Sequence, residues 1–367
     1  MERELTEMLK GCRPVKDKDG NIVVQSIMNM QVVTLTTDSE NSLDDRFANP
    51  LTSLVSSNQS YGQITFTNKE NKEVILPVQM AILTKQQAQN HGMVKAGYVE
   101  PKANTTYHDA GCVQGGQTGY FNGTQEFRMI PVSMREMLFD KVGYTEGYQN
   151  IYPAIQKLGQ DTQSGTGNYL NIYFEKFDKK LEQFIAHFER PKNLIGIIVL
   201  IDGEIVAIDK FPSFTYAEQV WDLMIRDCYG SLAIISELQH KTVGHSFTEA
   251  YEDIKKGTDK YSIVDLLEKA LKKTKKTITE DVQDRIQEVL ELTFDAELDT
   301  EGQSSSRTAP KSYILKESDN NYIGQIITEN EFNHLVSIIK RERFDPNAFR
   351  QVSELRNKAR RQKNFSL

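Results

Sequence analysis

Two short polar stretches carry side chains suited to hydrogen-bonding a sugar or a base. The first is Gln89, Asn90 and His91, and its amides both donate and accept hydrogen bonds, as ribose hydroxyls and base edges require. Because glycine has no side chain, a glycine backbone can also come close to a pyrophosphate. The second stretch combines such glycines with a thiol and an amide, in Cys112, Gln114, Gly115 and Gly116. We expect the two stretches to lie side by side around one ligand site.

The same region offers candidates for catalysis and for metal binding. His91, His108 or Asp109 could serve as a general acid or base, and Cys112 could serve as a nucleophile. However, no feature of the sequence gives Cys112 a basic partner, and the two histidines and Cys112 are spaced more widely than the paired ligands of most zinc sites. The sequence therefore identifies no catalytic residue, and it predicts neither a metal site nor a cofactor.

Short strands are expected to position these residues. Residues 22–35 are rich in Val, Ile and Met and follow a turn sequence, which predicts a strand. Residues 64–67 and 74–76 are two further apolar runs, and the polar connection between them predicts a hairpin. Residues 88–123 are dense in glycine, which is typical of strands joined by loops. We therefore expect a β-rich half over residues 22–140.

The middle of the chain adds helices and one well-marked hairpin. Apolar residues recur at intervals of three and four over residues 174–188, which predicts an amphipathic helix. Residues 195–208 hold two β-rich runs around Asp202 and Gly203, a dipeptide that favours an antiparallel hairpin because both turn positions need positive φ. Thr215, with a Glu three residues later, forms a capping box that predicts the start of a helix.

The last third continues this mixture. Residues 263–271 and 282–294 each present one apolar helical face, and residues 300–312 have the composition of a linker. Residues 313–327 predict a pair of closing strands, and residues 332–339 predict either a continuation of that pair or a helix. Hairpins and helices thus occur in segregated runs without a regular β-α-β alternation, which favours an α+β fold.

Composition and charge suggest four parts. The hydrophobic fraction is 38%, and no apolar run approaches the ~18 residues needed to cross a bilayer. The first ten residues lack the features of a signal peptide, and the three cysteines are far apart, so we expect a cytoplasmic protein without disulfides or a membrane segment. The predicted parts are an N-terminal segment (1–21), a β-rich half (22–140), an α+β half (141–340) containing the linker, and a basic tail (341–367).

The tail differs in charge from the rest of the chain. From Lys340 to Lys363, nine basic residues stand against three acidic ones, although the whole chain carries a net charge of −7. Such a tail can neutralise nucleic-acid phosphates. It can also dock on protein, because Phe349, Val352 and Leu355 would share one face of a helix. We expect docking on this chain or on another subunit, with nucleic acid as a secondary partner. The basic residues that would make either contact are Arg350, Arg356, Lys358, Arg360 and Arg361.

Four stretches, in order along the chain, resemble a known protein family. Residues 88–91 are similar to the family's Lys-Gln-Asn-Arg run, and residues 112–116 are similar to its Cys-Val-Glu-x-Gly element. The hairpin and helix of residues 195–221 and the closing strands of residues 313–336 follow in the family's order. On these motifs the chain resembles the ARG-and-rhodanese-phosphatase-superfamily-associated protein domain family, where ARG means ADP-ribosylglycohydrolase. The resemblance implies a part in ADP-ribose or NAD-linked biology, within a multi-gene defence or stress system.

The chain departs from this family at its acidic positions. Members typically carry two glutamates shortly before the Gln-Asn step, where this chain has Ile82 and Leu83, and Gln114 replaces the Glu of the second motif. A carboxylate can take a proton, whereas an amide cannot. We therefore expect a recognition protein for ADP-ribose, an NAD-derived nucleotide or an ADP-ribosylated target. The alternatives are a hydrolase or transferase acting on ADP-ribose linkages, and a structural partner that uses the basic tail.

Overall fold

A large antiparallel sheet forms the centre of the molecule. The structure, a computed structural model, describes residues 1–27, 30–37, 46–84, 89–116, 119–120, 125–140, 151–201, 203–243, 282–299, 309–330 and 332–341. Along the sheet the strand order is β1-β16-β17-β18-β19-β15-β14-β4-β2, and β3 also pairs with β4. The strands are β1 (Glu2–Glu4), β2 (Arg13–Pro14), β3 (Val24–Ile27), β4 (Met30–Thr36), β14 (Leu194–Ile201), β15 (Glu204–Lys210), β16 (Thr293–Leu298), β17 (Lys311–Glu317), β18 (Tyr322–Glu329) and β19 (Phe332–Lys340).

The hairpin predicted from the Asp-Gly dipeptide is confirmed. Strands β14 and β15 pair antiparallel, and Ile201 lies opposite Glu204 next to the turn. Gly203 has a φ of +81°, a value that a residue with a side chain rarely adopts. The closing strands are also confirmed, and residues 332–340 continue them as β19. Strand β19 pairs with both β15 and β18, so it joins the hairpin to the closing strands.

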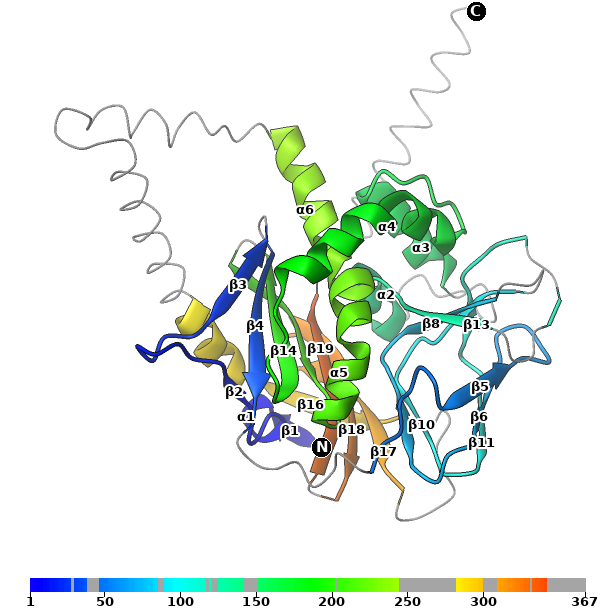
Figure 1. Cartoon of the computed structure of the whole chain (residues 1–367), viewed down its shortest axis with the longest axis horizontal. Helices are drawn as coiled ribbons and strands as arrows, with labels where there is room; N and C mark the ends of the chain where they lie inside the picture. Colours follow the sequence, from blue (N-terminus) through cyan, green and yellow to red (C-terminus); the bar gives the residue numbers. More distant parts are fainter. Residues whose placement is uncertain are drawn as a thin grey trace, which may run out of the picture.

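Both faces of the sheet are buried, and alternate side chains of each strand supply the two cores. In β14, Ile197 and Val199 belong to one apolar cluster, whereas Ile198 and Leu200 belong to the other. Helix α1 (Leu5–Met8) and the helical residues 282–290 contribute to the second cluster. The longer helices and the β-rich segment cover the first face, as Figure 1 shows. A central sheet covered on both sides is a common way to bury apolar strands in an α+β protein.

Three smaller sheets make up the β-rich segment. Strands β5, β6 and β11 form one sheet, β7 and β10 form the second, and β8, β9, β12 and β13 form the third. The predicted hairpin between residues 64–67 and 74–76 is therefore wrong, because β6 and β7 belong to different sheets. Their bounds are β5 (Leu54–Ser57), β6 (Ile64–Asn68), β7 (Val74–Leu76), β8 (Met80–Thr84), β9 (His91–Gly92), β10 (Gly97–Val99), β11 (Asn104–Tyr107), β12 (Gly111–Cys112) and β13 (Gln125–Met129).

The helices between residues 132 and 243 cover one face of the sheet (Figure 1), whereas α1 and residues 282–290 pack in the cluster on the other face. They are a 3-10 turn (Val132–Met134), α2 (Arg135–Asp140), α3 (Tyr152–Asp161), α4 (Leu170–His187), α5 (Phe214–Leu223), a π-helix (Met224–Tyr229) and α6 (Gly230–Val243). The predicted cap of α5 is wrong by two residues: the Ser213 side chain accepts a hydrogen bond from the Tyr216 N–H at 3.1 Å and takes the position expected for Thr215. Within the described part of the chain, no helix is both long enough and apolar enough to span a membrane.

The chain thus has the α+β fold that its sequence predicts. The division into four parts stays a prediction, and the large sheet takes strands from residues 2–36 as well as from residues 194–340. The apolar face predicted over residues 263–271 lies outside the described residues, as do most of the linker and all of the tail beyond Arg341.

Candidate functional site

The two polar stretches singled out in the sequence do lie side by side. Strands β9 and β12 pair antiparallel, which sets His91 opposite Cys112. Just outside the strands, the Val113 N–H donates a hydrogen bond to the Asn90 carbonyl at 3.1 Å. On its other side β9 pairs with β8, and there His91 lies opposite Ile82. Residues from three neighbouring strands therefore meet at one place.

Glycines allow this close packing. A Cβ atom added at Gly92 would lie 2.8 Å from Cδ1 of Ile130, a distance that real side chains essentially never show. Beyond β12 the chain turns at Gly116, which has a φ of +75°. The Gly115 N–H donates a hydrogen bond to the Asn168 carbonyl at 2.9 Å, so the turn is held against the start of α4. The glycines expected to approach a ligand are thus also required by the packing of the chain itself.

The two amides of the first stretch have different surroundings. The Asn90 side chain is bonded at both ends: its Oδ1 accepts from the Thr84 N–H at 2.7 Å, and its Nδ2 donates to Gln114 Oε1 at 2.5 Å. Asn90 therefore ties β8 to the second stretch. Gln89 is only 2% exposed, and no described residue donates a hydrogen bond to its Oε1. A buried amide oxygen without a donor is costly, so Gln89 is the better candidate for a ligand contact.

The titratable groups of the site are neutral near pH 7. The His91 ring is fully buried, with Nδ1 at 2.9 Å from the Gln89 carbonyl, and burial lowers the pKa of His91 to about 4. Burial also raises the pKa of the Cys112 thiol, although hydrogen bonds involving Tyr152, the Gln114 backbone and Gln89 partly oppose this. A protonated thiol is a poor nucleophile.

The other candidates for catalysis are differently placed. Asp109 pairs with Lys95 at 3.1 Å. Lys95 also pairs with Asp299 at 2.7 Å, so it joins the β-rich segment to the end of β16 and Asp109 is part of this ion-pair cluster. His108 is exposed to solvent. Among the described residues, no group of three or more His, Cys, Asp or Glu side chains is arranged to hold a metal ion.

A second group of polar side chains, which the sequence analysis missed, lies beneath helix α5. Asp209 is 3% exposed, and its two carboxylate oxygens each accept from Arg135 Nη1 at 3.1 Å. The Tyr229 hydroxyl donates to the same carboxylate, and Arg135 also reaches Ser337 and Cys228. Burial raises the pKa of Cys228 to about 12. The one signal in the sequence was the charged residue that directly follows the apolar run of residues 205–208 in strand β15.

The π-helix supplies a second buried ion pair. Arg128, in β13, donates to both oxygens of Asp227 at 2.8 and 2.9 Å, and its guanidinium lies over the Phe174 ring at 4.2 Å from the centroid. Asp178 of α4 pairs with Arg128 at 2.7 Å. The six-residue π-helix thus contributes to both networks. It supplies Asp227, which pairs with Arg128, and Tyr229, which donates to the carboxylate that pairs with Arg135. π-Helices are rare and often accompany functional sites.

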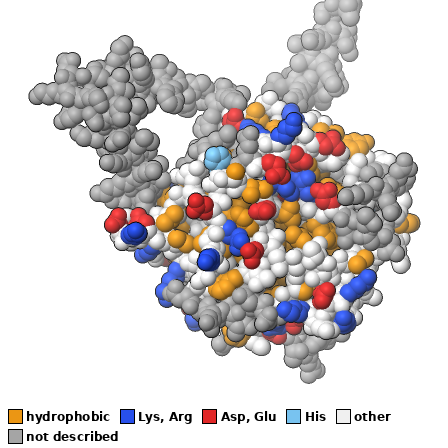
Figure 2. Space-filling view, in the orientation of Figure 1, with side chains coloured by type: hydrophobic (Ala, Val, Ile, Leu, Met, Phe, Trp, Pro, Cys, Tyr) orange, Lys and Arg blue, Asp and Glu red, His pale blue; other side chains and the backbone are white. Residues whose placement is uncertain are grey.

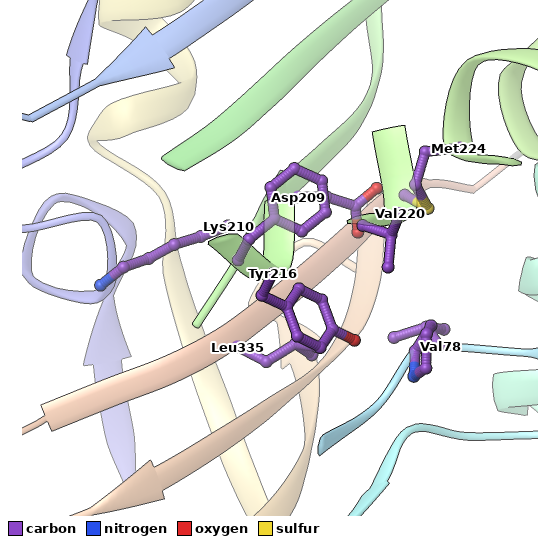
Figure 3. Close-up of a pocket in the computed structure, with 9 residues that line it drawn as sticks. Val78, Asp209, Lys210, Tyr216, Val220, Met224 and Leu335 are labelled. Atoms are coloured by element: carbon purple, nitrogen blue, oxygen red, sulfur yellow. The ribbon is translucent and has the colours of Figure 1, made fainter. Parts of the chain in front are cut away.

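A small pocket lies next to Asp209 (Figure 3). Asp209 and Tyr216 point toward it, and Val78, Val220, Met224 and Leu335 enclose it. The pocket has room for about one water molecule, which is far too little for a nucleotide. The buried Tyr216 hydroxyl has no hydrogen-bond partner among the described residues, so a single water between Tyr216 and Asp209 suits this space.

Lys210 has different surroundings from its neighbour Asp209. Its ammonium group points away from the pocket and donates to the Met8 carbonyl at 3.4 Å. Burial lowers the pKa of Lys210, and the nearby Cys12 partly opposes this. The pocket itself therefore holds a carboxylate and a phenol within a structural network and offers no room for a larger ligand.

Comparison with protein families connects this architecture to a known group. The model of the ARG and Rhodanese-Phosphatase-superfamily-associated Protein domain matches residues 21–303, which is about three quarters of the chain. The chain belongs to this family. The match includes both polar stretches and the β14–β15 hairpin and ends before β17, although strands β17 to β19 complete the same sheet. Searches of curated proteins and of solved structures found no match.

Proposed function

We propose that this protein recognises ADP-ribose, an NAD-derived nucleotide or an ADP-ribosylated target, and that it does so without efficient catalysis. One observation carries the proposal. Ile82 and Gln114, at two positions where the resembled family has acids, border the paired stretches: Ile82 lies opposite His91 and Gln114 accepts from Asn90. A third such position, Leu83, follows in β8. At these three positions the chain therefore has no carboxylate that could serve as an acid or a base.

The chemistry of the remaining side chains supports binding. Gln89 offers a buried amide oxygen to a hydroxyl or amino group, and Gln114 is partly exposed beside it. The family name adds the ADP-ribose theme through the letters ARG, which we take to mean ADP-ribosylglycohydrolase. A role within a multi-gene defence or stress system rests on the resemblance alone.

Calorimetric titration of the full chain with ADP-ribose and with NAD tests the proposal, together with the variant Gln89→Leu. Leucine has a similar size but no hydrogen-bonding group. The change removes the unsatisfied Oε1, which favours the folded state, and also the hydrogen bond between Gln89 and Cys112, which opposes it, so thermal stability should change little. If Gln89 binds the ligand, the variant should lose affinity at least about tenfold, because a hydrogen bond to the ligand is lost. Gln31→Leu makes the same change at another buried glutamine whose Oε1 has no donor among the described residues, in strand β4 of the large sheet, and serves as the matched control.

Two results would contradict the proposal. If neither ADP-ribose nor NAD binds, the chain has another ligand or none. If Gln89→Leu binds as well as the wild type but unfolds at a lower temperature, Gln89 has a purely structural role. Chromatography of NAD incubated with the pure protein tests the absence of catalysis, and rapid release of nicotinamide or AMP would favour the hydrolase or transferase alternative.

A further inference from the structure

Exposed tyrosines gather around the paired stretches. Among the described residues, six large hydrophobic or aromatic side chains are strongly exposed, and three of these are Tyr61 (39%), Tyr120 (56%) and Tyr169 (39%). Single exposed apolar residues are normal on a protein surface, but exposed aromatic rings beside both paired stretches need an explanation.

Tyr169 borders the second stretch directly. Its backbone forms an antiparallel bridge with Gln114, and its hydroxyl lies 3.2 Å from the position that a Cβ atom at Gly116 would take. Tyr169 comes immediately before helix α4, where it is the N-cap residue. Its ring is therefore held at the edge of the turn that contains Gly116.

Tyr120 borders the first stretch. It follows Gly119, whose carbonyl accepts a hydrogen bond from the Gln89 N–H at 3.4 Å. The Tyr120 ring lies 5.7 Å from the Tyr61 ring, with a tilt of 41°, so the two rings support each other. Because Gly116 and Gly119 are three residues apart, their Cα atoms are at most about 11 Å apart. Both ring groups thus lie near the same site.

The described side chains of the two paired stretches and of the three tyrosines carry no formal charge. They are amides, tyrosines, the neutral His91 and the protonated Cys112. Proteins usually bind phosphate groups with Arg or Lys side chains or with helix N-termini. The N-terminus of α4 lies nearby, but the Leu170 and Ile172 N–H groups already donate to the Val113 and Tyr169 carbonyls at 2.9 and 3.2 Å. Uncharged amides and aromatic rings instead suit the uncharged part of a nucleotide, because every base has a face that stacks on an aromatic ring.

We propose that Tyr61, Tyr120 and Tyr169 form a stacking platform for a nucleobase, and that the site reads the nucleoside part of its ligand and not the phosphates. This inference rests on the proposed function and adds the chemical group that is recognised. Gln89 is bonded through its backbone to Gly119, next to Tyr120, and Gln114 is bridged to Tyr169, so their amides are placed to offer hydrogen bonds to the base edge or to the ribose.

A ligand series tests the inference with the full-length protein. Calorimetric affinities are measured for ADP-ribose, adenosine and ribose 5-phosphate, each at 50 and 200 mM salt. A site that reads the nucleoside should bind adenosine nearly as tightly as ADP-ribose and should not bind ribose 5-phosphate. The affinity for ADP-ribose should change by less than about twofold between the two salt concentrations, because screening acts on charge pairs.

Variants of the tyrosines test the platform itself. Tyr120→Ala and Tyr169→Ala should each weaken adenosine binding by at least about fivefold, because stacking of a base is lost. Tyr120→Phe keeps the ring and should bind as the wild type does. Phe332→Ala, another exposed aromatic that lies on β19, is the control and should change nothing. If an alanine variant fails to fold, the ligand series alone decides.

The outcomes separate this inference from the proposed function. The proposed function stands but the stacking platform is contradicted in two cases. In the first, ADP-ribose binds to the wild type and to the alanine variants equally well. In the second, ribose 5-phosphate binds as tightly as ADP-ribose. A strong salt dependence would likewise show that phosphates are recognised. If none of the ligands binds, both proposals fail.

Discussion

At the scale of single residues, the buried ion pairs are the most expensive features of this protein. Arg135 is fully buried, and its charge is compensated by Asp209 at 3.1 Å. Removing a charge from water costs several kcal/mol, and only close, well-hydrogen-bonded partners offset this cost. The exposed pair of Glu7 and Lys10, at 3.5 Å, has no such requirement.

This difference predicts the effect of two matched substitutions. Asp209→Asn keeps the shape of the side chain but leaves the Arg135 charge uncompensated, so the free energy of unfolding should fall by about 3–5 kcal/mol. Glu7→Gln, at the exposed pair, should lower it by less than about 0.5 kcal/mol. Urea denaturation followed by circular dichroism measures both. Equal effects of the two substitutions would show that the buried pair is not the source of the stability.

The buried histidines predict a second effect, on pH dependence. Burial lowers the pKa of both His91 and His334 to about 4, from an ordinary value near 6.5. Between these two values the unfolded chain binds more protons than the folded one. The stability is therefore fully present above about pH 6.5 and is lost as the pH falls toward 4, by on the order of 3 kcal/mol for each histidine.

Denaturation curves between pH 4 and 7.5 measure this loss. His334→Gln should reduce the slope of stability against pH, whereas His108→Gln, at an exposed position, should leave it as in the wild type. A variant without His334 that keeps the full pH dependence would contradict the assignment. The slope would then come from other groups, for example the carboxylates near Arg46.

At the scale of elements, the sequence predicted the features that neighbouring residues determine, such as a tight turn, but not the partner of each strand. The β14–β15 hairpin was predictable because an Asp-Gly dipeptide between two β-rich runs favours one backbone geometry. The hairpin between residues 64–67 and 74–76 was wrong because a polar loop does not determine the partner of a strand: β6 pairs with β11, and β7 pairs with β10. The cap of α5 was misplaced because both Ser213 and Thr215 are good capping residues, and only the backbone geometry distinguishes them.

The turn of this hairpin allows a test at a single position. Gly203→Ala places a side chain at a φ of +81° and should lower the free energy of unfolding by about 1–2 kcal/mol. Gly203→Asn should lower the free energy of unfolding by less, because Asn tolerates a positive φ better than Ala does. A Cβ atom at this position would meet no neighbour within 4 Å, so backbone strain is the only effect expected. Equal losses for the two variants in thermal denaturation would contradict this explanation.

At the scale of the whole molecule, distant parts of the chain meet in one sheet. Strand β1 pairs with β16, and β4 pairs with β14, although each pair is far apart in the sequence. The same distance explains why the Arg135–Asp209 network was missed: no sequence pattern connects two residues that are 74 positions apart. The pairing of the stretches around His91 and Cys112 was predictable because they are close in the sequence and joined by strands and loops.

The basic tail raises a question of charge at this scale. Acidic and basic side chains lie next to one another on the face in Figure 2, so that face offers no single-sign surface to the tail (341–367), which has eight basic and three acidic residues. At physiological salt, charges interact over only about 8 Å, so general attraction to the acidic body would not select one docking position. The apolar residues Phe349, Val352 and Leu355, which would share one face of a helix, are better suited to select one docking position.

Deleting residues 342–367 tests this expectation, because the shortened chain keeps every described strand up to Lys340. If the tail docks through its apolar residues, the deletion should lower the thermal stability or change the mass measured by light scattering. Replacing Phe349, Val352 and Leu355 with Ser should then have the same effect as the deletion. Replacing Arg356, Lys358, Arg360 and Arg361 with Gln should have little effect on either measurement. If only the arginine and lysine replacements matter, and they abolish a salt-sensitive retention of RNA or DNA, the tail is a nucleic-acid arm and the docking prediction is wrong.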